Sequence, residues 1–435
     1  MTMTRPDSIE QLPVAAAVAA VPARRVAVVG CGYVGLPVVM LAVAAGHTVV
    51  AFDTDPYRVL RLENGDPYVP DVTGQQLRAA LATGRLIPTG DSDALEGFDV
   101  ALIAVPTPTD GNRPDLRCVE AASKTVAAYL RPGATVVLES TTYPGTTETV
   151  VVPILETSGF TVGTGIRVGY APERINPGSP LTELVSVPKI VAGIDDESRE
   201  VVAEFWRGLV DEVVLAPDIR TAELAKLIEN TFRLVNISLV NELARYAPAL
   251  GASIWDALRL AATKPYGYME FHPSIGAGGH CLPADTRYLA WSIREASGAP
   301  ARLVETASRI NDAMPTYVAG RIVSGLRRRE HAPDRACIVV VGVTYKADVP
   351  DLRESSALKV VDELRRFSAD VIVVEPLVSE VPTMLQELTV EMVARASVVA
   401  VLVAHRALDY DLIRSASYVF DACFALPPAP NVERL

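Results

Sequence analysis

The stretch RVAVVGCGYVG, residues 25–35, decides the expected fold of the N-terminal half of the chain. It begins with a short apolar, β-branched run, which is typical of a buried parallel strand. After the glycines an apolar helical stretch continues to Gly46, where a helix stop is expected, and a second strand over residues 48–52 ends at Asp53. This order of strand, GxGxxG, helix, strand and acid is the fingerprint of a dinucleotide-binding domain.

The glycine turn is expected to bind a dinucleotide cofactor. Glycines permit the tight turn and let a pyrophosphate rest on the helix N-terminus, where backbone N–H groups favour anions. Asp53 can accept hydrogen bonds from both hydroxyls of the adenosine ribose, which predicts NAD rather than NADP. Arg58 either flanks that ribose or is a solvated helix charge. The cofactor residues predicted in the turn are Gly30, Gly32, Tyr33, Val34 and Gly35.

Polar clusters follow three later strands of the same half. Buried strands are expected at residues 99–105, 135–138 and 166–169, with shorter candidates at 189–193 and 212–215. Thr107, Thr141 and Glu173 come directly after the first three of these strands. Each cluster alone is equally explained as a turn or a cap. Because ligands bind beyond the carboxyl ends of strands in doubly wound sheets, the three together predict a site.

Residues 217–250 predict one long helix that is apolar on several sides and therefore buried nearly all round. Lys226, Asn230, Arg233 and Asn241 recur on roughly one face of this helix. Charges inside a buried helix are costly unless they are paired or bind a ligand. This face either pairs with acids across an interface or lines an active site, and the second interpretation is favoured because buried ionisable groups cluster at functional positions.

A glycine-dense stretch, PSIGAGGHCLPADT at residues 273–286, places Cys281 just before a helix expected at 283–296. Asp285 follows four residues after the thiol. The alternative to a reactive Cys281 is a buried structural cysteine, since free cysteine usually behaves as a small hydrophobe. Tyr266 and Tyr268 precede this stretch beside glycine and proline and suggest a shaped binding loop. A further long helix is expected at 301–328.

Length and composition exclude several classes of protein. A chain of 435 residues predicts two or three domains. The net charge of −12 argues against nucleic-acid binding, and no apolar run is long enough to span a bilayer. The first 23 residues lack a basic leading region, so a loose tail is expected rather than a signal peptide. Five scattered cysteines without a CxxC pair or a metal motif suit a reducing cytoplasm and predict no metal.

A second domain is expected to start near Asp334. Strands at 337–341, 371–374, 397–403 and 418–420 alternate with helices, and the tail from Ala425 is expected to be irregular. This pattern is a second, smaller doubly wound sheet without a GxGxxG. The predicted fold class is therefore α/β, with two doubly wound Rossmann-like domains joined by a long central helix.

The chain resembles the nucleotide-sugar 6-dehydrogenases, the family of UDP-glucose, UDP-N-acetylglucosamine and UDP-N-acetylmannosamine dehydrogenases. The resemblance covers Arg24 to about Val403 and is carried by GCGYVGLP, AVPTPTD, ESTTYPGTT, APERINPG, KLIENTFRLVNISLVNELA, KPYGYMEFHPSIGAGGHCLPADTRYL and GVTYKADVPDLRESSALKV. The PER form of the Glu173 motif and the His280-Cys281 pair resemble the N-acetylhexosamine branch. After the flexible tail expected at 1–23, the resemblance implies an NAD-binding Rossmann domain at 24–217, a central helical dimerisation and catalytic-loop segment at 218–333, and a sugar-nucleotide-binding domain at 334–435.

The resemblance also implies a covalent mechanism that oxidises a primary alcohol to a carboxylate. Cys281 would add to the aldehyde formed by the first hydride transfer, giving a thiohemiacetal that loses a second hydride and becomes a thioester. Lys226 and Asn230 resemble the family's oxyanion-stabilising pair. Glu173 would be the general base for the hydrolytic water, with Thr141 holding that water and Asp285 orienting Lys226 or the water network.

Further ligand contacts are implied in the same way. Lys346 resembles a lysine that contacts the substrate, and Arg353 resembles an arginine that reaches the cofactor. Thr107 and Thr141 complete the predicted NAD site. The substrate residues assigned by the resemblance are Glu173, Arg174, Lys226, Asn230, Arg233, Tyr266, Tyr268, Gly278 and Lys346. A homodimer that uses NAD and a UDP- or dTDP-hexose is expected.

The chain departs from the family pattern around the substrate. Ser274 and Ile275 replace a Gly-Pro pair, Ala284 and Thr286 flank Asp285 in place of Val and Pro, and Pro177 stands where the UDP-glucose branch has a second glutamate. The sugar, N-acetylhexosamine or glucose, and the base, uridine or thymidine, therefore stay open.

Two other functions also stay open. One is a two-electron β-hydroxyacid dehydrogenase of the 6-phosphogluconate type, against which Cys281 and the second sheet argue. The other is a non-catalytic NAD-binding sensor, which would have no need of Lys226, Cys281 and Glu173 together.

Overall fold

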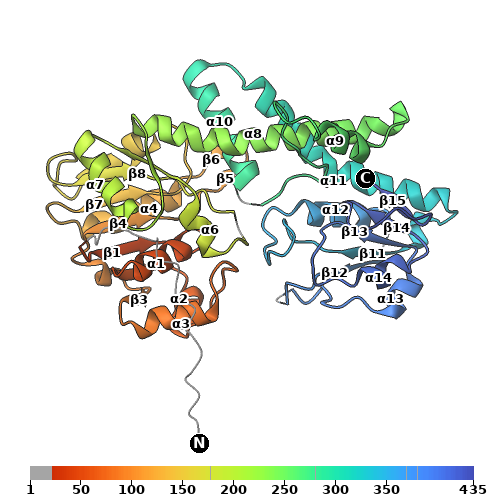
Figure 1. Cartoon of the computed structure of the whole chain (residues 1–435), viewed down its shortest axis with the longest axis horizontal. Helices are drawn as coiled ribbons and strands as arrows, with labels where there is room; N and C mark the ends of the chain where they lie inside the picture. The colour runs from red at the N-terminus through yellow and green to blue at the C-terminus, as the bar shows by residue number, and fades with distance from the viewer. Residues whose placement is uncertain (1–21, 177, 280, 369, 380) are drawn as a thin grey trace, which may run out of the picture. The chain divides into compact units, whose positions relative to one another are not determined.

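The computed structural model describes residues 22–176, 178–279, 281–368, 370–379 and 381–435, and of Cys281 only the backbone. The described chain forms two compact units, the first ending at Leu227 and the second beginning at Ile228. Each unit contains a twisted sheet with helices packed on it (Figure 1). The expected tail at 1–23 lies almost entirely outside the described residues.

The first unit is built on an eight-stranded sheet with the order β10-β9-β8-β7-β4-β1-β2-β3. The run from β3 through β1 to β4 and β7 is the strand order of a dinucleotide-binding sheet, with its switch point between β1 and β4. The strands are β1 (Arg25–Val29), β2 (Thr48–Phe52), β3 (Leu86–Thr89), β4 (Val100–Ile103), β7 (Thr135–Leu138), β8 (Arg167–Tyr170), β9 (Lys189–Gly193) and β10 (Val213–Leu215). A hairpin of β5 (Thr109–Asp110) and β6 (Arg113–Pro114) lies outside this sheet.

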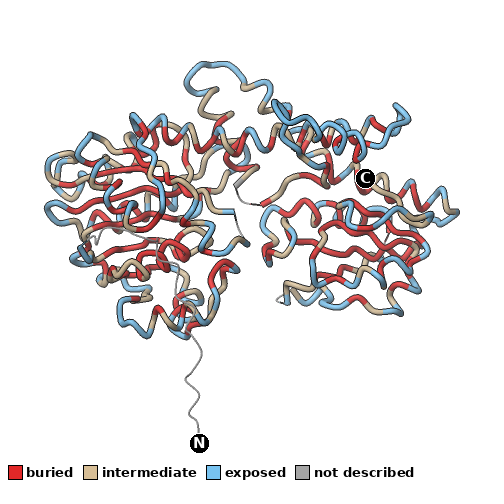
Figure 2. The backbone as a smooth tube through the Cα atoms, in the orientation of Figure 1, coloured by how far each residue is buried: buried red, intermediate tan, exposed pale blue. Residues whose placement is uncertain are grey.

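Helices cover both faces of this sheet because the strands are apolar on both sides. Val26 and Val28 of β1 face one core, and Ala27 and Val29 face the other. The first core is closed by α1 (Gly35–Ala44), α3 (Gly74–Ala82) and α7 (Asp196–Arg207). The second is closed by α4 (Arg117–Ala128), α5 (Val152–Glu156) and the start of α8 (Ile219–Tyr246). The remaining helices are α2 (Pro56–Glu63) and α6 (Leu181–Ser186). Figure 2 shows the strands as the most continuously buried segments of each unit.

The second unit contains a parallel sheet with the order β12-β11-β13-β14-β15. This is the flavodoxin-like order, in which ligands bind where the chain switches direction between the first and third strands. The strands are β11 (Cys337–Val341), β12 (Asp370–Val374), β13 (Val398–Val401), β14 (Val419–Asp421) and β15 (Val432–Arg434). The helices are α9 (Ile254–Ala261), α10 (Cys281–Ser297), α11 (Arg302–Arg328), α12 (Ser356–Arg365), α13 (Val390–Arg395) and α14 (Tyr410–Arg414).

The predicted fold class is confirmed, with three local differences. First, β9 pairs antiparallel with β8, so the first sheet is mixed at that edge. Second, the tail from Ala425 is not irregular throughout, because β15 adds an edge strand to the second sheet. Third, α10 begins at Cys281 rather than at Pro283. The ends of helices and strands depend on capping and tertiary contacts, which the local hydrophobic pattern of the sequence does not predict.

The prediction that the helix at 217–250 is buried nearly all round is wrong. Helix α8 carries six exposed apolar side chains spaced by three, four or seven residues, so they follow one stripe along the helix. Arg233, expected on the buried polar face, is exposed as well. No helix within the described ranges is long and apolar enough to cross a membrane. The exposed stripe consists of Leu224, Ile228, Phe232, Leu239, Leu243 and Tyr246.

The three glycines of the first turn have different physical tasks. Gly30 has φ of +94°, which L side chains rarely adopt. A Cβ on Gly35 would lie 1.8 Å from the carbonyl oxygen of Gly30, so no side chain fits there. A Cβ on Gly32 would meet nothing within 4 Å, so the backbone at Gly32 is open on the side where the fingerprint places the pyrophosphate.

This difference predicts opposite effects of two alanine substitutions. Gly35→Ala should lower the free energy of unfolding by about 3 kcal/mol, because the added carbon displaces the backbone of the turn. Gly32→Ala should change it by less than about 0.5 kcal/mol but weaken NAD binding, because its methyl group enters the space for the pyrophosphate. Urea denaturation and NAD titration of both variants measure these effects. Wild-type NAD affinity in Gly32→Ala would contradict the assignment.

Candidate functional site

Asp53 joins the glycine turn to the end of β2. Its buried carboxylate accepts hydrogen bonds from the backbone N–H of Cys31 at 2.8 Å and of Asp55 at 2.9 Å. Arg58 forms an ion pair with the same carboxylate at 3.4 Å. The residues predicted for the adenosine end of NAD are therefore together in the first unit, beside the N-terminus of α1.

The polar residues predicted after three strands lie along one sheet edge. Thr107 follows β4, Thr141 follows β7 and Glu173 follows β8, and these strands are parallel neighbours. Thr107 and Glu173 are buried. The structure thus brings three candidates from distant sequence positions to the carboxyl edge of the sheet that also carries the glycine turn.

Glu223, which was not predicted as a site residue, holds the turn after β7 in place. Its carboxylate accepts the backbone N–H groups of Gly145 at 2.5 Å and Thr147 at 3.0 Å, and the Thr147 hydroxyl at 2.7 Å. Burial raises the pKa of Glu223 to about 7, although the hydrogen bonds from Thr147 and Gly145 act in the opposite direction. The feature of the sequence that could have indicated Glu223 is its spacing, since it lies three residues before Lys226 and therefore on the same face of α8.

Lys226 and Asn230 lie one turn apart on α8 and both are buried. Lys226 forms no ion pair or hydrogen bond within the described ranges, which is costly for a buried cation and is typical of a group that meets a charged ligand. In the second unit, the Asn230 amide donates to the Asp285 carboxylate at 2.5 Å. This bond ties α8 to the first turns of α10, which begins at Cys281.

The loop before Cys281 is held by two buried asparagines. Asn241 accepts the N–H of Ser274 at 2.7 Å. Asn311, which the sequence did not single out, accepts the N–H of Ala277 at 2.6 Å and donates to its carbonyl at 3.0 Å. A Cβ on Gly278 would lie 2.5 Å from the carbonyl oxygen of Glu354, so this glycine is needed for close backbone packing.

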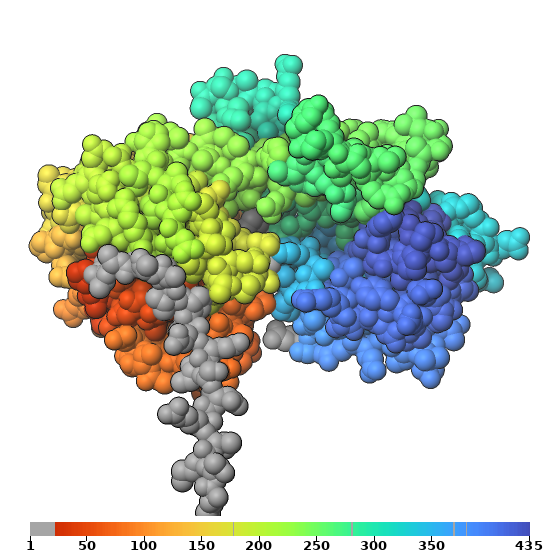
Figure 3. All heavy atoms as spheres, viewed as in Figure 1, coloured from red at the N-terminus to blue at the C-terminus, as the bar shows by residue number. Residues whose placement is uncertain are grey.

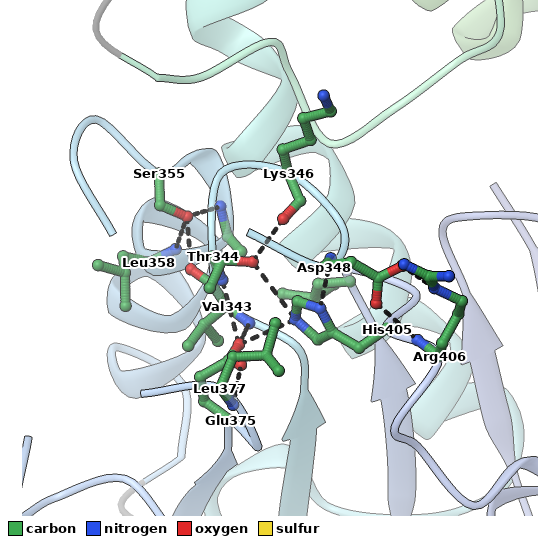
Figure 4. A network of polar contacts seen from close by, with 12 residues as sticks. Val343, Thr344, Lys346, Asp348, Ser355, Leu358, Glu375, Leu377, His405 and Arg406 are labelled. Carbon is green, nitrogen blue, oxygen red and sulfur yellow. Dashed lines mark hydrogen bonds and ion pairs between the residues drawn. The ribbon is translucent and has the colours of Figure 1, made fainter. Parts of the chain in front are cut away.

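A second polar network lies at the switch point of the second sheet (Figure 4). The fully buried Glu375 accepts the N–H groups of Val343 at 2.7 Å and Thr344 at 3.2 Å, and His405 Nε2 lies 3.1 Å from the same oxygen. His405 Nδ1 accepts the N–H of Asp348 at 3.0 Å, so the ring proton belongs on Nε2.

This network holds the loop that carries Lys346. Thr344 donates its hydroxyl proton to the Lys346 carbonyl at 2.8 Å. Burial opposes ionisation of Glu375, but the hydrogen bonds from His405 and from the backbone N–H groups of Val343 and Leu377 outweigh it and lower its pKa. Neither Glu375 nor His405 was predicted, because only the sheet brings the ends of β12 and β13 beside the loop after β11.

The other predicted residues are more dispersed. Arg353 forms a bidentate ion pair with Asp351, and the Arg174 guanidinium donates to the Pro188 carbonyl at 2.7 Å. Tyr266 is 73% exposed and Tyr268 is 37% exposed. Pro177 and His280, for which the sequence made predictions, lie outside the described residues, as does the thiol of Cys281.

Together, the glycine turn, Asp53 and the open backbone at Gly32 fit NAD and define an NAD-binding dehydrogenase fold. Sequence models of the UDP-glucose/GDP-mannose dehydrogenase family match the chain in three parts: the NAD binding domain over 24–210, the central domain over 220–313 and the UDP binding domain over 339–428. The chain belongs to this family of NAD-dependent nucleotide-sugar dehydrogenases. Membership decides against the β-hydroxyacid dehydrogenase and the sensor.

Individual relatives agree with this membership. A UDP-N-acetyl-D-mannosamine dehydrogenase of Pyrococcus horikoshii is 36% identical over 357 residues, which are 81% of this chain and 84% of that protein. A UDP-N-acetyl-D-glucosamine 6-dehydrogenase of Pseudomonas aeruginosa is 37% identical over 360 residues, 82% of this chain and 83% of its own. The solved structure of the UDP-D-ManNAc dehydrogenase of P. horikoshii superposes with a TM-score of 0.87 at 32% identity and covers 94% of this chain and 98% of its own.

The geometry at Asp53 makes a cofactor-specific prediction. Asp53→Ala should raise the Kd for NAD roughly 10- to 100-fold, because hydrogen bonds from ribose hydroxyls to a charged acceptor contribute about 1.5–3 kcal/mol. Affinity for the sugar nucleotide should not change, because Asp53 belongs to the turn of the first sheet. Calorimetric titration of each ligand measures both constants, and an equal loss of both would contradict the cofactor assignment.

Proposed function

We propose that the chain oxidises the C6 hydroxymethyl group of a UDP-N-acetylhexosamine to a carboxylate by way of a Cys281 thiohemiacetal and thioester. The glycine turn and Asp53 would hold NAD, which would supply the hydride acceptor for each oxidation. The proposal is carried by the buried hydrogen bond between Asn230 and Asp285, because it joins the face of α8 that also bears Lys226 to the helix that begins at Cys281.

Each buried polar residue has a step to perform in this scheme. The buried ammonium group of Lys226 and the Asn230 amide stabilise the alkoxide and the later oxyanions, whose charge grows in the transition state. Asp285 accepts from Asn230 and so fixes the direction of that amide. Cys281 captures the aldehyde, which prevents its release between the two oxidations.

Glu173 is the general base of the hydrolytic step. Water gives a proton to the Glu173 carboxylate while its oxygen bonds to the thioester carbon, and the Cys281 sulfur leaves as a thiolate. Thr141 lies at the same sheet edge and holds this water. Lys346 and Arg174 bind the substrate, and Thr107 and Arg353 bind the cofactor.

The sugar assignment rests on two supports. The PER form of the Glu173 motif resembles the N-acetylhexosamine branch. Two relatives above 35% identity are named for UDP-N-acetylmannosamine and UDP-N-acetylglucosamine. Turnover of UDP-glucose in preference to both UDP-N-acetylhexosamines would contradict the assignment.

Substitution of the thiol tests the covalent route. Cys281→Ser should still bind NAD and the sugar nucleotide but form no carboxylate, because a serine adduct does not yield a readily hydrolysed thioester. NADH formed per sugar consumed is the measurement, with an expected value of two for the wild type. Wild-type carboxylate formation by Cys281→Ser would refute covalent catalysis.

The protein is proposed to be a homodimer that buries the exposed stripe of α8. Six large apolar side chains on one helix form a patch of the kind found at protein interfaces. The green segment with the second half of α8 and with α9 lies at the surface of its unit (Figure 3). The isologous pairing of one helix with its copy gives a closed, two-fold assembly.

A charge placed in this stripe tests the dimer. Phe232→Glu should convert the dimer to a monomer, because it buries an unpaired carboxylate at the interface. Leu303→Glu is the matched control, since Leu303 is an exposed apolar residue near the N-terminus of α11. Light scattering during gel filtration gives the mass of each variant, and an unchanged dimer in Phe232→Glu would exclude this surface.

A further inference from the structure

Three buried ionisable side chains meet behind the carboxyl edge of the first sheet. The Lys189 ammonium group lies 3.1 Å from Glu173 Oε2 and 3.5 Å from Glu139 Oε2. The three residues come from the start of β9 and from the ends of β8 and β7, which are neighbours in the sheet. The exposed fractions of the side chains are 4% for Lys189, 6% for Glu173 and 0% for Glu139.

Lys189 is the cation that forms an ion pair with both carboxylates, so its charge favours the ionised form of each. Its ammonium group lies 3.9 Å from the centre of the Trp206 ring of α7, which excludes water on that side. Arg174 also contacts Glu173: its backbone N–H donates to Glu173 Oε1 at 2.6 Å, while its guanidinium donates to the Pro188 carbonyl at 2.7 Å.

Glu139 is held much less firmly than Glu173. Both of its carboxylate oxygens are buried without a hydrogen-bond partner in the described part of the chain, and the Lys189 ion pair is its only close charge contact there. Burial raises the pKa of Glu139 to about 7, opposed by Lys189 and reinforced by Glu173. One ammonium group thus serves two carboxylates, and only Glu173 also receives a backbone hydrogen bond.

We propose that Lys189 is a positioning residue that keeps the Glu173 carboxylate ionised and correctly oriented, and that Glu139 competes for the same ammonium group and so limits how strongly Glu173 is held. This inference rests on the proposed role of Glu173 as the general base. A buried carboxylate without a cation becomes protonated and cannot accept a proton from water. A carboxylate paired too strongly with a cation is a weak base.

The pH dependence of thioester hydrolysis tests the proposal. The rate falls on the acidic side when the general base becomes protonated, so a change that favours its protonated form moves this acid limb to higher pH. Lys189→Met should move the limb upward by about 1–3 pH units, because the opposite charge is lost. Glu139→Gln should leave the acid limb in place, because Glu139 is protonated there, and should lower the rate above about pH 7, where the wild-type Glu139 is ionised and draws Lys189 away from Glu173. Steady-state rates across pH, under conditions where hydrolysis limits turnover, measure both effects.

The pre-steady-state burst separates this role from a general loss of structure. Both hydride transfers precede hydrolysis, so Lys189→Met should retain a burst of two NADH per active site. Lys189→Arg should restore part of the wild-type profile, since it returns a cation to the pocket. Lys124→Met, which removes an exposed lysine on α4, should leave the profile unchanged.

The outcomes distinguish this inference from the proposed function. If Glu173→Gln keeps its burst but loses turnover, while Lys189→Met shows the wild-type acid limb, the positioning role is refuted and the proposed function stands. If Glu173→Gln turns over like the wild type, Glu173 is not the base and both proposals fall. Glu139→Gln is nearly isosteric, so a wild-type rate above about pH 7 in this variant refutes the competition for Lys189 even if Lys189→Met does not fold.

Discussion

Backbone N–H groups at the ligand-facing ends of the strands need acceptors, and buried carboxylates supply them in both units. Asp53 accepts from Cys31 and Asp55, Glu223 accepts from Gly145 and Thr147, and Glu375 accepts from Val343, Thr344 and Leu377. A turn that leaves a strand has no ladder partner, and an unpaired buried N–H costs roughly 1–3 kcal/mol. These carboxylates therefore determine the shape of the loops on which the proposed chemistry depends.

Backbone proximity is the second constraint on the site. At Gly35 and Gly278 the neighbouring carbonyl oxygen occupies the space of a side chain. The glycine-dense stretch before Cys281 thus packs on its own unit, where Asn241 and Asn311 hold it through its backbone. A reactive residue at the start of α10 is in this way carried by a loop with few alternative conformations.

Much of the fold could be predicted from local pattern. The β-branched runs, the GxGxxG fingerprint and the acid after β2 predicted the first sheet and its cofactor, and the second sheet followed from the same alternation. Local pattern failed for α8, because apolar residues on several sides of a helix do not reveal which side faces solvent. It also failed for β15, a short edge strand whose pairing partner lies elsewhere in the chain.

The sequence by itself determined the α/β class, NAD as the cofactor and the family, because spacing along a single strand, turn or helix carries that information. Only the tertiary structure decided which distant polar groups meet. Glu375 and His405 hold the Lys346 loop because parallel strands bring their ends to one edge of the second sheet. Glu139, Glu173 and Lys189 share one charge cluster because the antiparallel pairing of β9 with β8 brings the start of β9 beside the ends of β8 and β7. The physical reason is that burial sets the strength of a charge interaction, and burial is a property of the folded chain.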